Sequence, residues 1–338
     1  MSLYGLLVGR GPSGFSYNST AEQVTEGLDL TGRTYVVTGC NSGIGAETGR
    51  VLALRGAQVI GCARTKDKAL AAGEAWPGEV IGVACDLSEP SHVQQAAAEI
   101  RATGRAIDGI IANAGIMALP RREARYGIEL QMLTNHVGHF ILVDGLRESL
   151  TEDGRVVMVS SSAHSHPYRQ GIRFDDWAAE RGYQGWLAYG STKLANHLFA
   201  VELSKRLGPR QVANSVHPGV ISTNLLRHQS RLLSPLLEAV TPLAFKTIPQ
   251  GAATQVYAAT HPDTATIEGQ YFADCQVRTP SRQARDETLA RRLWEETEAR
   301  VADLTGASAD RIYSESPGST PVSQRLSSQM PMGRGPHS

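Results

Sequence analysis

Short apolar runs alternate along this chain with longer segments in which apolar residues recur every three to four positions. Short runs are typical of buried strands, and the longer spacing is typical of helices that bury one face. The predicted strands cover residues 34–38, 57–62, 80–84, 107–112, 154–160, 211–216 and 269–272. The predicted helices cover residues 43–55, 91–103, 126–149, 186–207, 249–260 and 282–304. This alternation predicts an α/β protein with a central parallel sheet of about seven strands flanked by helices.

The alternation runs from residue 31 to residue 313 with no change of composition, so it predicts a single domain. Residues 1–30 precede this domain as an N-terminal extension that is at first polar and rich in Gly and Ser. Residues 314–338 are rich in Ser, Pro and Gly, and this composition predicts a disordered tail.

The bulk composition argues against several classes of protein. Of the 338 residues, 41% are hydrophobic, and 33 basic and 33 acidic residues give a net charge of zero. This balance argues against a nucleic-acid partner, and no apolar run is long enough to span a bilayer. The cysteines have neither metal-site nor disulfide-framework spacing, so we predict no metal; they are Cys40, Cys62, Cys85 and Cys275. Reduced thiols and a poor signal peptide favour a cytoplasmic location.

A glycine-rich segment, Thr38–Gly45, lies between a predicted strand and a predicted helix. A helix N-terminus presents unpaired N–H groups to a phosphate, and glycine allows the close approach of the backbone. The segment therefore predicts a dinucleotide site, with a glycine-rich turn of another α/β protein as the alternative. The candidate contacts are Gly39, Asn41, Ser42, Gly43, Ile44 and Gly45.

Tyr189 and Lys193 lie four positions apart in a predicted helix, so their side chains share one face. A nearby ammonium lowers the pKa of a phenol, and such a tyrosine can exchange a proton with a carbinol oxygen near pH 7. The pair alone is a weak signal, because the same spacing occurs by chance on solvated helices. Three serines, residues 160–162, follow an apolar strand. One hydroxyl there could polarise a substrate carbonyl, or the serines could simply end the strand.

In their order along the chain, these segments resemble the short-chain dehydrogenase/reductase family. The matching motifs are Thr38-Gly-x-x-x-Gly-Ile-Gly45, Asn113-Ala114-Gly115, Asn135, Ser161, Tyr189-x-x-x-Lys193 and Pro218-Gly219. The resemblance covers roughly residues 30 to 305 and implies a Rossmann-type, doubly wound single domain. Residues 135–140, 191–196, 217–220 and 269–275 further resemble the retinol-dehydrogenase-like branch.

The resemblance implies a catalytic tetrad of Ser161, Tyr189, Lys193 and Asn135. We expect Tyr189 to be the general acid in reduction and the base in oxidation. Lys193 is expected to tune Tyr189 and to hold the nicotinamide ribose. Ser161 is expected to polarise the carbonyl, because it is favoured over Ser160 and Ser162 by the family pattern. Asn135 is expected to support a water chain that returns the proton.

The end of the second predicted strand bears on the choice of cofactor. An NAD enzyme usually has a carboxylate here, whereas this chain has Arg64 with Lys66 nearby. A guanidinium pairs with a 2′-phosphate, so we predict NADP(H), with a solvated basic turn as the alternative. The resemblance adds the expected cofactor contacts Asp86, Leu87, Asn113, Ala114, Gly115, Pro218, Gly219, Ile221 and Thr223. For Asp86, a turn-forming role is the alternative.

Two segments, residues 162–188 and 221–248, are expected to surround the substrate. The second is rich in leucine, including Leu225 and Leu226, and His164 and Tyr183 in the first could line the opposite wall. This pattern predicts a bulky apolar ketone, aldehyde or alcohol. An amphipathic helix pair that only covers the core would show the same leucines.

The sequence thus predicts an NADP(H)-dependent oxidoreductase that interconverts a carbonyl and an alcohol by hydride transfer. The alternatives are reduction of an activated C=C bond by the same residues, and a catalytically silent NADP(H)-binding sensor. The resemblance also makes a homodimer or homotetramer that pairs through the helices at 126–149 and 186–207 a candidate, with a monomer, which this branch also contains, as the alternative.

Overall fold

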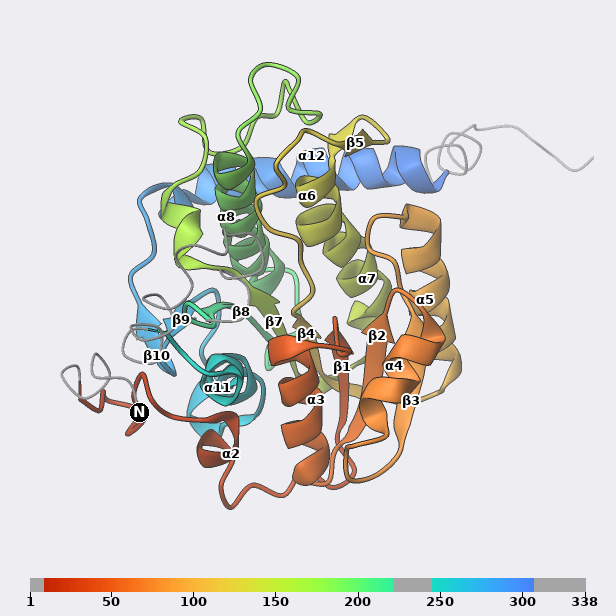
Figure 1. The fold of residues 1–338 in the computed structure, drawn as a ribbon, viewed down its shortest axis with the longest axis vertical. Helices are drawn as coiled ribbons and strands as arrows, with labels where there is room; N and C mark the ends of the chain where they lie inside the picture. The colour runs from red at the N-terminus through yellow and green to blue at the C-terminus, as the bar shows by residue number, and fades with distance from the viewer. Residues whose placement is uncertain (1–8, 222–244, 307–338) are drawn as a thin grey trace, which may run out of the picture.

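A central sheet of eight strands organises the protein, whose computed structural model describes residues 9–221 and 245–306. The strands are β1 (Thr34–Thr38), β2 (Gln58–Ala63), β3 (Val80–Ala84), β4 (Ile107–Ala112), β7 (Leu150–Val159), β8 (Val212–His217), β9 (Tyr271–Ala273) and β10 (Gln276–Arg278). Their order is β10-β9-β8-β7-β4-β1-β2-β3 (Figure 1). All neighbours are parallel except the β9–β10 pair at one edge. The predicted doubly wound parallel sheet is confirmed, and β10 is an addition to the seven expected strands.

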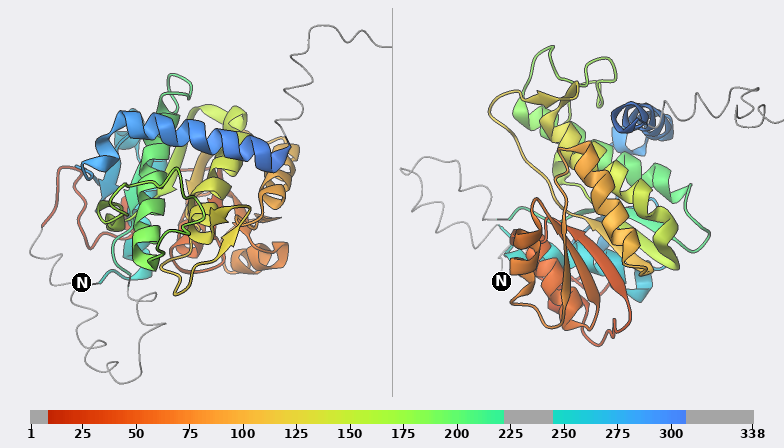
Figure 2. Two further views of the ribbon diagram at one scale, coloured as in Figure 1. Left: turned by 90° about the horizontal axis from the view of Figure 1, so that it is seen from above. Right: turned by 90° about the vertical axis from the view of Figure 1, so that its right-hand side faces the viewer.

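Helices cover both faces of this sheet (Figure 2). They are α2 (Ala21–Val24), α3 (Gly43–Leu54), α4 (Lys66–Gly73), α5 (Pro90–Ala102), α6 (Leu130–Met132), α7 (Gly138–Leu146), α8 (Gly185–Ser204), α11 (Ile248–Thr260) and α12 (Glu287–Thr305). Strand residues alternate between two cores, so that Val36 packs with the α5, α7 and α8 side and Val37 with the α3 and α11 side. Among the described residues, no helix is long and apolar enough to cross a bilayer.

The helix predicted over residues 126–149 is interrupted in the structure. A two-stranded hairpin, β5 (Ala124–Arg125) and β6 (Ile128–Glu129), precedes α6. A π-helical turn, η1 (Leu133–Val137), then separates α6 from α7. Such turns insert one extra residue into a helix and are frequent at functional sites. The apolar periodicity that predicted one helix did not reveal this interruption.

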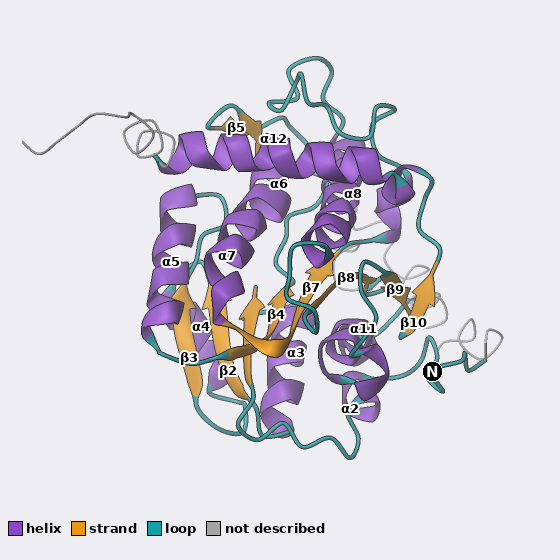
Figure 3. Ribbon diagram, turned by 180° about the vertical axis from the view of Figure 1, so that it is seen from behind, coloured by secondary structure: helices purple, strands orange, loops and turns teal. Residues whose placement is uncertain are grey.

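The long helix α12 lies across the outer side of α8 and reaches α5 (Figure 3). Its Trp294 stacks on Phe199 of α8, with centroids 5.4 Å apart and an interplanar angle of 3°. The same indole lies 4.8 Å from the ring of Phe140 in α7. The helix faces through which we expected homo-oligomer pairing are therefore partly covered by the chain itself.

Candidate active site

The glycine turn after β1 leaves the start of α3 open to solvent. Gly39 and Gly43 have φ of 67° and 56°, a left-handed backbone that favours glycine. Ser42 caps α3 without a side-chain hydrogen bond, and Asn41, Ser42 and Gly43 are exposed. A Cβ at Gly43 would meet no atom within 4 Å, so the backbone here is accessible. This arrangement fits a pyrophosphate, because a helix N-terminus binds anions.

Gly45 and Asn113 hold the glycine turn against the centre of the sheet. A Cβ at Gly45 would lie 2.2 Å from the Gly39 carbonyl oxygen and 2.4 Å from Asn113 Nδ2. Asn113 Nδ2 in turn donates to the Thr38 carbonyl at 2.8 Å. The backbone N–H groups of Asn113 and Ala114 both donate to the Thr38 hydroxyl, at 2.9 and 3.0 Å. The ends of β1 and β4 are therefore fixed to each other at Asn113.

The two basic residues after β2 differ in their contacts. Arg64 is exposed, and within residues 9–221 and 245–306 it has no hydrogen-bond or ion-pair partner. Lys66 Nζ lies 2.8 Å from Glu99 Oε1, on α5. Arg64 is thus available to an anion, whereas Lys66 already neutralises a carboxylate.

Asp86 and Leu87 have local structural roles. Asp86 Oδ1 accepts hydrogen bonds from the Ser88 N–H at 3.0 Å and from the Ser88 hydroxyl at 2.8 Å. This is the turn that we considered as the alternative for Asp86. Leu87 is buried, and its carbonyl oxygen would lie 2.3 Å from a Cβ at Gly138, so it packs against the start of α7.

Tyr189 and Lys193 share one face of α8, and Ser161 lies beside them just after β7. A hydrogen bond joins the Ser161 and Tyr189 side chains. Lys193 Nζ lies 5.5 Å from the centroid of the Tyr189 ring and donates to the Val159 carbonyl at 2.9 Å. The structure thus brings together a phenol, an ammonium and a hydroxyl, which are the groups that proton transfer to a carbonyl needs.

The expected lowering of the Tyr189 pKa by Lys193 is not found. Burial raises the pKa of Tyr189 to about 12, and only the hydrogen bond with Ser161 acts in the opposite direction. Burial also lowers the pKa of Lys193 to about 8. Lys193 does not lower the pKa of Tyr189 because its ammonium is directed at the Val159 carbonyl rather than at the phenol oxygen.

The three adjacent serines have different environments. Ser160 is buried, and its hydroxyl donates to the Lys193 carbonyl at 2.7 Å, which ties β7 to α8. Ser162 is exposed, and its N–H donates to His217 Nδ1 at 3.3 Å. Ser161 alone of the three is hydrogen-bonded to Tyr189. The geometry therefore favours Ser161 as the hydroxyl that a substrate would meet.

Asn135 lies in the π-helical turn η1 and is fully buried. Its Oδ1 accepts from the Ile116 N–H at 2.8 Å, and its Nδ2 donates to the Ile116 carbonyl at 2.9 Å and to the Thr192 hydroxyl at 3.1 Å. A Cβ at Gly115 would lie 3.1 Å from Asn135 Oδ1 and 3.6 Å from Lys193 Nζ. Gly115 therefore allows Asn135 and Lys193 to approach the same point of the backbone.

The Pro218-Gly219 turn rests on a residue that the sequence analysis missed. Gly219 has φ of 91°, and a Cβ there would lie 2.6 Å from Cδ of Lys246. Lys246 is buried, its Nζ lies 2.7 Å from Asp274 Oδ1, and the Tyr17 ring lies 4.7 Å away on another side. No local motif marks these residues, since they meet only in the folded chain. The N-terminal extension thus contacts Lys246, the residue that supports the turn that we expect at the nicotinamide.

Ile221 joins this turn to the glycine loop. A Cβ at Gly251 of α11 would lie 2.3 Å from Ile221 Cδ1 and 2.8 Å from Ile44 Cγ2. Both predicted contacts therefore pack on one glycine of α11. Thr223, Leu225 and Leu226 lie outside the described residues, as does most of the expected substrate segment 221–248.

The two residues predicted to line the substrate wall, His164 and Tyr183, are hydrogen-bonded within the protein. His164 is buried, its Nδ1 lies 2.6 Å from the Ser161 carbonyl oxygen, and its Nε2 accepts from the Ser281 N–H at 3.1 Å. The Tyr183 hydroxyl donates to the Leu119 carbonyl at 2.9 Å and accepts from Gln131 Nε2 at 3.0 Å. The polar atoms of both side chains are therefore used within the protein, and the prediction that these residues line the substrate wall stays a prediction.

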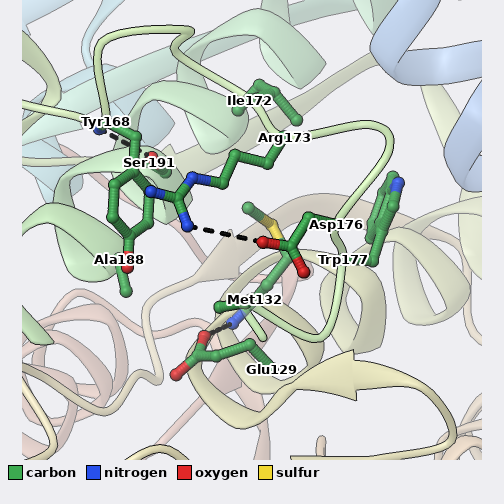
Figure 4. Close-up of a pocket in the computed structure, with 10 residues that line it drawn as sticks. Glu129, Met132, Tyr168, Ile172, Arg173, Asp176, Trp177, Ala188 and Ser191 are labelled. Carbon is green, nitrogen blue, oxygen red and sulfur yellow. Dashed lines mark hydrogen bonds and ion pairs between the residues drawn. The ribbon is translucent and has the colours of Figure 1, made fainter. Parts of the chain in front are cut away.

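The segment 162–188 also encloses a small cavity of about 30 Å³ (Figure 4). Arg173 lies 3.5 Å above the Tyr168 ring and pairs with Asp176 at 3.5 Å, while Glu129 accepts from the Met132 N–H at 2.9 Å. A space of this size holds about one water molecule. This cavity is therefore too small to bind a bulky substrate.

Trp186 provides an apolar surface at the catalytic tyrosine. Its side chain is 51% exposed, at the first turn of α8. Its ring meets the Tyr189 ring edge to face, with centroids 6.1 Å apart. Trp186 thus places an exposed indole beside the Tyr189 ring.

Comparison with known proteins gives a consistent result. Residues 33–174 match the short chain dehydrogenase family profile. Short-chain dehydrogenase TIC 32 A, chloroplastic, from Brassica napus is 42% identical over 311 residues, which cover 87% of this chain and 97% of that protein. Human retinol dehydrogenase 14 is 37% identical, with coverage of 81% and 88%.

Solved structures agree with these relatives. A putative uncharacterized protein from Mycobacterium paratuberculosis has a TM-score of 0.66 and 35% identity, over 82% of this chain and 96% of that one. A short chain dehydrogenase from Burkholderia cenocepacia, solved in complex with NADP, has a TM-score of 0.55 and 23% identity, over 72% and 96%. The second likeness concerns the fold alone.

Proposed function

Because this chain belongs to the short-chain dehydrogenase family of oxidoreductases, we propose that it interconverts a bulky apolar ketone or aldehyde and its alcohol with NADP(H). The observation that carries the proposal is the hydrogen bond between Ser161 and Tyr189 beside the ammonium of Lys193. A bound nicotinamide supplies the hydride, while the protein supplies the proton and holds the carbonyl.

The proton is placed by Tyr189 and Ser161. With a pKa raised to about 12, the Tyr189 phenol is protonated at neutral pH, so it is ready to act as a general acid. The Ser161 hydroxyl donates to the same carbonyl oxygen and stabilises the negative charge that develops there. A protonated phenol is the form of Tyr189 that reduction of a carbonyl requires.

The choice of NADP(H) is supported by Arg64. Its exposed guanidinium, which has no partner among the described residues, follows β2, where a 2′-phosphate would lie in this fold. Arginine pairs with phosphate through two parallel hydrogen bonds. The open start of α3 would hold the pyrophosphate of the same cofactor.

The apolar substrate class is supported by Trp186, which extends from α8 next to Tyr189.

We keep the cytoplasm as the predicted location, although the Brassica napus relative has the word chloroplastic in its name. Imaging of the tagged full-length protein in its own cells tests the location.

The test of function is NADPH oxidation across ketones and aldehydes of increasing size, with the products identified. We expect alcohols as products, higher kcat/KM for bulky apolar substrates, and no turnover by Tyr189→Phe although it still binds NADPH. A saturated ketone as product would instead indicate reduction of a C=C bond. Tight NADPH binding without turnover of any substrate would indicate the sensor function.

A further inference from the structure

We propose that His139 is a positioning residue that ties the backbone carbonyl of Asn135 to the cofactor turn at the ends of β1 and β4. It does so with one defined tautomer, in which Nδ1 carries the proton. The inference rests on the proposed function, because the part of Asn135 in the reaction belongs to it.

His139 lies between two functional segments at hydrogen-bond distance from each. Its Nε2 lies 2.9 Å from the Thr38 hydroxyl oxygen, at the end of β1. Its Nδ1 lies 2.9 Å from the carbonyl oxygen of Asn135, one turn earlier in the chain. His139 and Asn135 are both fully buried. A single side chain thus connects the glycine turn to the π-helical turn.

The directions of these hydrogen bonds follow from the donors at Thr38. The hydroxyl oxygen of Thr38 already accepts from the N–H groups of Asn113 and Ala114. These two donors use both of its lone pairs, so the hydroxyl proton must point to His139 Nε2. Nε2 is then the acceptor, and the ring proton lies on Nδ1, where it donates to the Asn135 carbonyl.

The carbonyl of Asn135 is the part of this residue that is left for the reaction. Its side-chain amide is held by Ile116 and Thr192 on both of its polar atoms. The backbone in this π-helical turn departs from regular α-helix, so the carbonyl needs another group to fix its direction. We infer that the His139 N–H supplies this constraint.

The environment supports the uncharged ring that this arrangement needs. Burial lowers the pKa of His139 to about 4; the hydrogen bond to Asn135 opposes this shift and the positive charge of Lys193 adds to it. His139 therefore holds two segments together without adding a second charge beside Lys193.

The tautomer can be measured without any turnover. In the full-length protein with ¹⁵N-labelled histidine, NMR at pH 7 should show a buried ring with a protonated Nδ1 and an unprotonated Nε2, in addition to that of His164, whose contacts with the Ser161 carbonyl and the Ser281 N–H require the same tautomer. The signals of this ring should disappear in His139→Asn, which assigns them. A proton on Nε2, or on both nitrogens, would overturn the inference, whether or not a substrate has been found.

The effect on the reaction separates positioning from simple packing. We expect His139→Phe to lower kcat by about tenfold or more, with the Kd for NADPH changed less than about threefold, because a small misplacement costs much in rate. His139→Asn, whose amide can still donate near the Asn135 carbonyl, should recover part of the rate, whereas His139→Gln should not.

His136 is the matched control, because it is a buried histidine three residues away that contacts Thr297 through Nε2 at 3.0 Å. His136→Phe should lower the melting temperature but leave kcat per folded molecule unchanged. Equal rates for wild type, His139→Phe and His136→Phe would refute the positioning role. If the wild type reduces no carbonyl at all, the proposed function fails, and the NMR result alone decides the hydrogen-bond arrangement.

Discussion

The two ends of the proposed cofactor site differ in how exposed their residues are and in how those residues are hydrogen-bonded. At the adenosine end, Ser42, Gly43 and Arg64 are exposed, and the backbone forms the binding surface. At the catalytic end, Asn135 and Lys193 are buried, and their polar atoms are hydrogen-bonded to main-chain carbonyls or N–H groups. The protein therefore has an open surface that binds a charged group and a closed network that fixes a few reactive atoms.

This difference predicts where substitutions are costly. A buried polar group that loses its partner keeps the desolvation cost, so changes at the catalytic end should be large and coupled. An exposed side chain is already solvated, so its removal costs only the contact with the ligand. Removal of a single polar atom at the catalytic end should therefore lower kcat strongly. Substitutions at the adenosine end should change the preference between NADPH and NADH in smaller steps.

Replacement of the buried ammonium tests this contrast most strongly. Lys193→Met keeps the length of the side chain but removes its charge and its hydrogen bond to Val159. We expect kcat to fall by about 10²-fold or more, which is typical for loss of a group that serves acid–base catalysis. Steady-state kinetics with NADPH measures this effect, and a kcat within tenfold of wild type would contradict it.

The same variant predicts a distinct pH dependence of stability. The pKa of Lys193 is about 8 in the folded protein against an ordinary value of 10.5, so between these values the unfolded chain binds the extra proton. Stability of the wild type should therefore rise from pH 8 to pH 10.5, by on the order of 2–3 kcal/mol relative to Lys193→Met. Urea unfolding over this range measures it. The exposed Lys68→Met is the control and should show no such relative change.

Two glycines of the same turn give a matched pair at the adenosine end. Gly45→Ala places a methyl group against the Gly39 carbonyl, whereas Gly43→Ala meets no atom but keeps a strained φ of 56°. We expect Gly45→Ala to lower the free energy of unfolding by about 1–3 kcal/mol and Gly43→Ala by about 1 kcal/mol. Urea denaturation compares them, and the reverse order would show that the turn relaxes.

The sequence predicted the sheet and the group formed by Ser161, Tyr189 and Lys193, because both depend largely on local patterns. Apolar strands and the spacing of Tyr189 and Lys193 are readable from neighbouring residues. The family resemblance selected Ser161 from three adjacent serines, and the structure places the Ser161 hydroxyl in contact with Tyr189. Local signals therefore sufficed wherever one segment alone determines the geometry.

Other features depend on contacts between distant segments, and these were not predicted. His164 is hydrogen-bonded to the N–H of Ser281, and Gly219 packs on Lys246. Both contacts join parts of the chain that are far apart in sequence. The π-helical turn at Asn135 is stabilised by Ile116 and Thr192 rather than by its own sequence. The partial burial of Tyr189, which raises its pKa, likewise depends on the whole fold.

The smallest effects are expected at the exposed basic residues, where Arg64 and Lys66 form a matched pair. Arg64→Ala should raise the KM for NADPH by about tenfold while it changes the KM for NADH little, because a charged hydrogen bond to phosphate is lost. Lys66→Ala should change both KM values by less than about twofold, since Lys66 is paired with Glu99 and its exposed ion pair contributes little. Kinetics with the two cofactors separates these outcomes. A larger effect of Lys66→Ala would mean that Lys66 leaves Glu99 to bind the phosphate. The preference for NADPH would then depend on this exchange of ion pairs rather than on the guanidinium of Arg64.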